Sequence, residues 1–277
     1  MKKTRLIISI LLFAAVFSSS HKTAAQCIDR NFAFSGGEEA YYDVYYNWGF
    51  FWLHAGEAYF KANNSTFEGK PAYFLDSYGS SLKKWDWFFK VRDTYQAYVD
   101  TATLRPFFFI RQTSEGGHEV NNRLRFDHEN NRVFASTQNS KKPLKHDTLQ
   151  LPSCAYDVLS MIYVARNLQY ANYEIGDKIP ISCIIDGELY DLYIRYGGKE
   201  TIVTRDKVAY NCIKFKPLLV EGTIFSGGED MTVWVSDDDN RIPVLVEAKV
   251  LVGSIKAYLK TAKGVRNPVK SRLENNK

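Results

Sequence analysis

The sequence is most distinctive for what it lacks after its first 25 residues. Beyond that point no apolar run reaches the roughly 18 residues that a spanning helix needs, so we expect no transmembrane span in the mature chain. No CxxC pair and no Cys/His cluster is present, which gives no support for a metal site or for thioredoxin-like redox chemistry. The GxSxG, Walker, HExxH and dinucleotide-binding motifs are also absent. The sequence therefore indicates no cofactor and no familiar class of catalytic site.

A strong net charge is missing as well. The whole chain has 36 basic and 31 acidic residues, and its first 25 residues contain four of the basic ones, Lys2, Lys3, Arg5 and Lys22, and no carboxylate. Without them the chain has 32 basic and 31 acidic residues, a net charge of +1. Such a balance gives no field to attract nucleic acid, so we expect no nucleic-acid partner.

Residues 1–25 have the organisation of a secretory signal peptide. A basic start precedes an almost unbroken apolar run over 6–17, and small residues end the segment at Ala25. We expect cleavage near Ala25 and a mature chain in the periplasm or secreted. Lipoprotein anchoring at Cys27 is not favoured, because an attachment site has a small residue before the cysteine and this chain has Gln26.

Four cysteines remain in the exported chain: Cys27, Cys154, Cys183 and Cys212. An even number in an exported protein suggests two disulfides, with three pairings open. In the alternative, Cys183 and Cys212 lie within apolar strands and are buried free thiols. We expect at least one disulfide.

Most of the chain alternates between apolar and polar residues with a period of two, which predicts β-strands. The predicted strands before residue 150 are 40–48, 55–61, 71–79, 87–99, 106–114, 119–127 and 131–138. Those after residue 178 are 179–185, 188–197, 200–205, 208–219, 230–236, 242–250 and 253–261. The polar segment 139–152 is predicted to be a loop, Asp186-Gly187 a type I′ hairpin turn and Gly197-Gly198 a further turn.

One segment, 153–170, changes to helical periodicity. Ser153 is the expected N-cap, with Asp157 in the first turn. Apolar residues at helical spacing place Ile162 on the face toward the strands, where we expect it to be nearly fully buried. The sequence thus predicts one all-β domain over 26–262, an antiparallel meander curled into an open or closed barrel-like sheet with one buried helix near 153–170, and a polar, frayed tail over 263–277.

Several short motifs resemble an exported bacterial family known only as domain-of-unknown-function family 3108. The most specific is the helical stretch from Asp157 to Arg166, and others are Gly56-Glu57-Ala58, the stretch 89–93, Val233-Trp234-Val235 and the stretch 241–244. The resemblance implies a β-rich fold similar to that of YmcC-like envelope proteins, with a sheet curled around a helix. It brings no established reaction and no functional residues.

Aromatic residues are the outlier in composition, at 15% of the chain, and they crowd into consecutive runs. Because neighbours in a strand point to opposite faces, a run such as Phe107-Phe108-Phe109 must cover both faces of the sheet. Most of these rings are expected to be core, but an apolar ligand groove and a surface for a partner or a sugar stay open.

The candidate ligand-binding residues are Trp85, Trp87, Lys84 and Arg166. Strand alternation would place both tryptophans on one face, at the mouth of a groove, with Lys84 near an acidic head group. Arg166 could bind an anion inside the curl, although a structural ion pair is the competing interpretation.

Three functions follow from these observations. The first is a non-enzymatic binding module for an apolar or amphiphilic envelope molecule, a lipid or a glycan. The second is a structural or assembly factor that binds another envelope protein through a sheet edge. The third is a hydrolase with an unrecognised site, which would need a cleft that joins His, Asp and Ser. No catalytic residue and no metal ligand is assigned.

Overall fold

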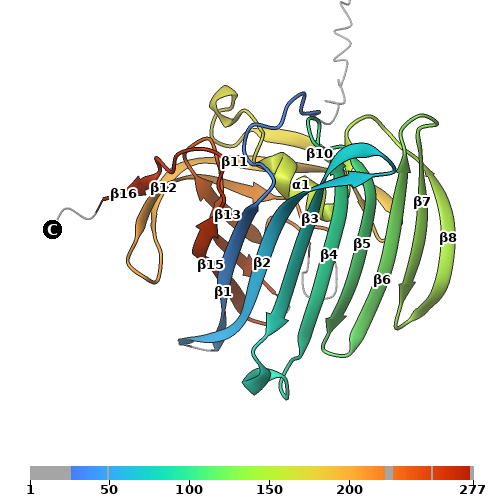
Figure 1. The fold of residues 1–277 in the computed structure, drawn as a ribbon. Coiled ribbons are helices and arrows are strands. Elements are labelled where there is room, and N and C mark those ends of the chain that lie inside the picture. The colour runs from blue at the N-terminus through green and yellow to red at the C-terminus, as the bar shows by residue number, and fades with distance from the viewer. Residues whose placement is uncertain (1–25, 49, 222–226, 251, 275–277) are drawn as a thin grey trace, which may run out of the picture.

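A computed structural model describes residues 26–48, 50–221, 227–250 and 252–274 (Figure 1). The predicted signal peptide, 1–25, lies outside the described residues. The first strands are β1 (Glu38–Trp48), β2 (Phe51–Phe67), β3 (Lys70–Ser81), β4 (Val91–Asp100), β5 (Pro106–Glu115), β6 (His118–Asp127), β7 (Arg132–Asn139) and β8 (Lys142–Gln150). The later strands are β9 (Ala155–Tyr156), β10 (Lys178–Ile185), β11 (Glu188–Val203), β12 (Ala209–Pro217), β13 (Met231–Ser236), β14 (Pro243–Lys249), β15 (Ser254–Lys263) and β16 (Arg272–Leu273). The helices are α1 (Val158–Ala165) and the 3-10 turns η1 (Lys83–Trp85) and η2 (Tyr170–Asn172).

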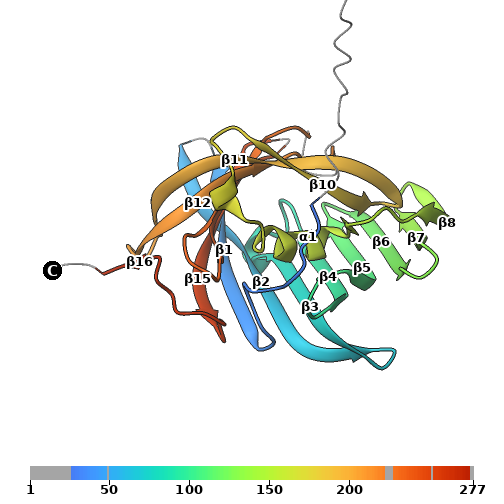
Figure 2. The same cartoon turned by 90° about the horizontal axis from the view of Figure 1, so that it is seen from above.

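All of these strands belong to one sheet, in the order β8-β7-β6-β5-β4-β3-β2-β1-β15-β14-β13-β12-β11-β10-β9, with β16 on β12. Neighbours along the chain pair antiparallel, and the short β9 pairs parallel with β10. Because β1 pairs with both β2 and β15, it joins two meanders into one surface. That surface curls around α1 and does not close (Figure 2). The predicted all-β meander with one helix is confirmed.

The turn between β10 and β11 reaches across the concave face of the opposite meander. Asp186 accepts hydrogen bonds from the Arg111 guanidinium at 2.9 Å and from the Asn122 amide at 2.6 Å. Asp186 and Gly187 both have positive φ, as a type I′ turn requires, so the predicted hairpin is confirmed. Side-chain contacts therefore bridge the two ends of the sheet where backbone pairing does not.

The core is a row of inward-facing side chains under α1. Leu75, Ala97, Phe109 and Leu124 stand side by side in register on β3 to β6, and all are buried. The helix packs on β3, β4 and β10, and its Tyr163 ring lies 4.7 Å from the ring of Phe34. This upper layer of the interior is close-packed and apolar.

A disulfide joins Cys27 to Cys154 and ties the start of the described chain to the residues before α1. Cys183 and Cys212 are free and buried. The expectation of at least one disulfide is confirmed, and the second pair follows the alternative of buried thiols.

The helix is shorter than predicted and turned differently. Its N-cap is Asp157, which accepts from the backbone N–H groups of Leu159 and Ser160, and not Ser153. The helix cannot begin at Ser153, because Ala155 and Tyr156 form β9 and pair with β10. Ile162 is 39% exposed, so the prediction that it faces the strands is wrong. Most of the helix circumference is buried, and Ile162 lies on the narrow arc that remains.

Three smaller expectations also fail. The predicted loop 139–152 contains β8, whose residues are mostly exposed; without a buried face it has no apolar alternation to reveal it. Gly197-Gly198 is a bulge inside β11 rather than a turn, because the register with β12 shifts there. The tail after Lys263 is held as far as residue 274, since β16 pairs with β12 and Ser271 donates to Asp238 at 2.7 Å.

Candidate functional site: an aromatic rim

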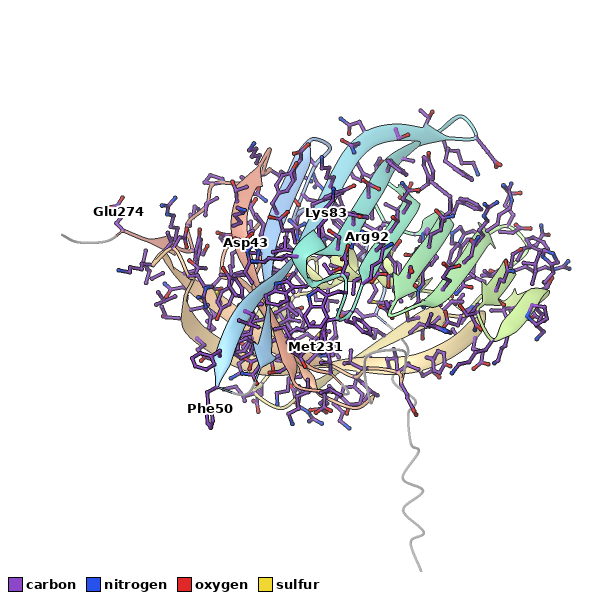
Figure 3. The ribbon with its side chains drawn as sticks, turned by 90° about the horizontal axis from the view of Figure 1, so that it is seen from below. Asp43, Phe50, Lys83, Arg92, Met231 and Glu274 are labelled. Atoms are coloured by element: carbon purple, nitrogen blue, oxygen red, sulfur yellow. A yellow bond between two sulfur atoms is a disulfide. The ribbon has the colours of Figure 1, made fainter. Side chains whose placement is uncertain are left out.

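Exposed aromatic side chains lie at two separate places on the lower end of the sheet, the β1–β2 turn and the β3–β4 connection that contains η1 (Figure 1). Phe50 and Phe51 lie in and next to that turn, and Phe50 is 98% exposed. Figure 3, which looks onto this end, shows Phe50 projecting beyond the ribbon. A sheet end cannot bury the residues of its own turns, so large apolar groups here need another reason to be present.

The connection between β3 and β4 supplies the other aromatic residues. Trp87, Phe88 and Phe89 are exposed, and Trp87 is 75% exposed. The Phe89 ring leans onto the β5–β6 turn, since a Cβ built on Gly116 would lie 2.4 Å from it. We call Phe50, Phe51, Trp87, Phe88 and Phe89 the aromatic rim.

The part of this connection that presents Trp87 is firmly anchored. Trp85 is half-buried and donates its indole N–H to the carbonyl of His54 on β2 at 2.8 Å. Asp86 accepts from the Ser81 hydroxyl and from the Arg92 guanidinium, both at 2.6 Å. These bonds hold η1 against the start of β2, so the neighbouring rings are displayed from a fixed base.

The charge around the rim is positive. Lys83, Lys84 and Lys90 are exposed, and no ion pair within the described residues includes them. The nearby Asp86 stays ionised, because hydrogen bonds from Ser81 and then Arg92 lower its pKa, and the Arg92 guanidinium at 2.6 Å balances its charge. Apolar rings beside uncompensated ammonium groups suit a molecule with an apolar part and an anionic head group.

The structure separates the residues that the sequence grouped together. Trp85 and Trp87 do not share a strand face, because η1 and a turn replace the predicted strand start at residue 87. The Trp85 ring anchors the connection, and the Lys84 ammonium lies 5.5 Å from its centroid. Trp87, by contrast, is exposed to solvent. The sequence analysis missed Phe50 and Phe51 as site residues, although the run Phe50-Phe51-Trp52 directly after Gly49 was a usable signal.

Arg166 lies elsewhere and is fully engaged. Its guanidinium donates to both carboxylate oxygens of Glu38, at 2.6 and 2.9 Å, and to the carbonyl of Asn240. Both side chains of the ion pair are about 5% exposed. Arg166 therefore forms a structural ion pair at the end of α1. It lies at the opposite end of the sheet from the aromatic rim.

Two other clusters were considered as chemical sites. Asp43, His54 and Glu57 have ligand atoms within 4.8 Å of one another, but the Lys260 ammonium lies 3.0 Å from Asp43 and 3.8 Å from Glu57. A cation therefore already occupies that position. Ser136 and His146 are hydrogen-bonded at 2.9 Å on the exposed outer face. The adjacent Asp147 alternates to the other face and pairs with Lys145, so these residues form no catalytic triad.

Within the described residues, no helix is both long and apolar enough to cross a membrane. The fold is similar to a β-barrel-like protein of domain of unknown function DUF1849 from Brucella abortus, known from a crystal structure. The TM-score is 0.54 at 11% sequence identity, over 83% of this chain and 98% of that one, which is a likeness of fold alone. No curated protein matches the sequence. The model of the protein family of unknown function DUF3108 matches residues 41–260, and the chain therefore belongs to that family.

Proposed function

We propose that this protein is an exported, non-enzymatic binding module that holds an amphiphilic molecule of the cell envelope at the aromatic rim. The observation that supports this most is the exposure of five aromatic side chains at one end of an otherwise well-packed sheet. Several large apolar side chains exposed at one end of a molecule support an interaction surface there. The proposed ligand has an apolar chain against the rings and an anionic head group near Lys83, Lys84 and Lys90.

Binding of monomeric laurate, followed by tryptophan fluorescence, tests this proposal. The double variant Phe50→Ser/Trp87→Ser should weaken laurate binding at least tenfold, because each ring covers part of the alkyl chain. The control is Phe134→Ser, which removes a partly exposed ring from β7 and should leave the affinity unchanged. Absence of laurate binding to the wild type, or equal binding by the rim variant, would reject the function.

The competing function is an assembly factor that adds a partner's strand to a sheet edge. The long free edge is β8, which pairs with β7 alone. That edge contains Pro143 and the exposed Lys142 and Lys145, the residue types that protect edges from strand addition. The rim is therefore the better candidate for a binding surface.

A further inference from the structure

The lower part of the concave face holds a polar cluster that the rim does not use. Two residues below the apolar row under α1, the inward positions are Ser77, Tyr95, Arg111 and Asn122 in register. Two residues lower still they are Gly79, Asp93, Thr113 and Val120. The interior therefore changes from apolar to polar toward the end that bears the rim.

Two carboxyl groups in this cluster lie near the Arg111 guanidinium, whose Nε has no hydrogen-bond partner, but they form no ion pair with it. Asp93 and Glu115 are diagonal neighbours on one face of β4 and β5, Glu115 is buried, and Asp93 accepts from the backbone N–H of Ser114 at 3.2 Å. The nearest guanidinium, Arg111, is paired with Asp186 at 2.9 Å, and no ion pair in the described part of the chain includes Asp93 or Glu115. Burial first, and then the charge of Glu115, raise the pKa of Asp93 to about 7. Two carboxyl groups in such contact need a shared proton or another cation between them.

An unsatisfied hydroxyl completes the cluster. Thr113 stands directly opposite Asp93 in the register and two residues from Glu115 on one face. It is 5% exposed, and its Oγ1 has no hydrogen-bond partner. Buried hydroxyls without a partner are rare in native proteins, so an absent partner is the simplest explanation.

Space is available beside these groups. Gly79 is the cross-strand neighbour of Asp93 on the other side, and a Cβ built there would have no heavy atom within 4 Å. Asp93 itself is partly exposed. A small group can therefore reach the carboxyl pair from the side of Gly79.

We propose that Asp93, Glu115 and Thr113 form a binding site for a primary ammonium group. An ammonium group has three donors and no acceptor, and the site offers three oxygen acceptors from three side chains. Its positive charge replaces the shared proton between the two carboxyl groups. The ring of Tyr95, next to Asp93 on the same face, already lies 5.9 Å from the Arg111 guanidinium and adds a further surface that favours cations.

The ammonium group could belong to a free amine or to a lipid head group, and two arms of one experiment separate these sources. The first arm titrates free ethanolamine into the full mature protein by calorimetry, with ethylene glycol as the neutral comparison. The second arm measures binding to vesicles of phosphatidylethanolamine against vesicles of phosphatidylcholine, whose quaternary ammonium cannot donate hydrogen bonds. The wild type should bind ethanolamine and not ethylene glycol, or should prefer the phosphatidylethanolamine vesicles.

Asp93→Asn and Glu115→Gln should each weaken that preference at least tenfold, and Thr113→Val should weaken it less. Both amide variants relieve the repulsion of the carboxyl pair, so they should fold. Asp43→Asn is the matched control, because it changes a carboxylate on the outer face and should have no effect. Failure of both arms in the wild type, or unchanged amine binding in Asp93→Asn and Glu115→Gln, would overturn the proposal.

The test of the ammonium site is independent of the function proposed for the rim. Phe50→Ser/Trp87→Ser should leave ethanolamine binding unchanged, and Asp93→Asn should leave laurate binding unchanged. A protein that binds laurate and no amine supports the rim alone, and the reverse pattern supports the inner site alone.

Discussion

The upper and lower parts of the concave face bury ionisable groups in opposite ways. Beneath α1, Arg166 and Glu38 form a bidentate ion pair whose remaining donors reach backbone carbonyls. Near the rim, Asp93 and Glu115 are two carboxyl groups on one face of β4 and β5, and the charge of Glu115 adds to burial in raising the pKa of Asp93. The first pair is satisfied within the chain and holds the structure together, whereas the second needs a proton or a ligand. The upper pair therefore contributes to stability, and the lower pair is where we propose that a ligand binds.

The largest effect is expected from a substitution that breaks the upper ion pair, Arg166–Glu38. Arg166→Met leaves Glu38 buried without its partner, and we expect a loss of about 3–5 kcal/mol in the free energy of unfolding. Chemical denaturation measures this loss. Arg195→Met is the control, because the Arg195–Glu229 pair is at the surface and should contribute at most about 1 kcal/mol. Equal losses in the two variants would show that the upper pair has no special role.

A second prediction concerns the orientation of the helix against the upper interior. Leu159 is 1% exposed, and Leu159→Ala should lower the free energy of unfolding by about 2–5 kcal/mol through the cavity it creates. Ile162→Ala should lower it by less than about 1 kcal/mol, because Ile162 faces solvent. Thermal melts of the two variants check the difference, and a reversed order would mean that the helix is turned the other way.

A third prediction compares the two tryptophans at the lower end. Trp85→Leu removes the indole N–H bonded to His54 and should destabilise the protein by about 1–3 kcal/mol. Trp87→Leu should change stability by no more than about 0.5 kcal/mol, because its ring is displayed to solvent. Denaturant midpoints measure both. If Trp87→Leu were the more damaging change, the rim would be part of the core and not a binding surface.

A fourth prediction tests the contrast between the two carboxyl environments through pH. The pKa of Asp93 is raised from 3.8 to about 7, so the folded state retains a proton that the unfolded chain releases. The contribution of Asp93 to stability is therefore fully present below about pH 4 and is lost as pH rises toward about 7. Asp93→Asn should be more stable than the wild type at pH 8, with a difference that shrinks by pH 4. Thermal melts across this range measure it, and parallel curves for the two proteins would contradict the raised pKa.

Much of the fold was predictable because its determinants are local. Period-two alternation identified most strands, and Asp186-Gly187 identified a hairpin because few residues adopt positive φ without strain. β8 was missed because a strand exposed on both faces has no such alternation. The orientation of Ile162 was wrong because two apolar stripes lie on the short helix, and the position of the surrounding sheet decides which one is buried.

The binding residues predicted from the sequence and the proposed rim share Trp87, and both remain predictions. The sequence paired Trp85 with Trp87 by a strand periodicity that η1 replaces. For Arg166 the sequence left open whether it binds an anionic ligand or forms a structural ion pair, since its partner Glu38 is 128 residues away in the chain. Phe50 and Phe51 were noticed only as part of an aromatic-rich stretch.

By itself, the sequence determined the all-β class, the single helix and the hairpin turn, because strand alternation, turn conformation and helix formation depend on near neighbours. Only the tertiary structure decided which cysteines pair, which helix face is buried, that the aromatic turns meet at one end, and that Asp93, Glu115 and Thr113 share one face. The first three outcomes depend on how distant segments are set beside one another in the curled sheet, whereas the last depends on the register between β4 and β5.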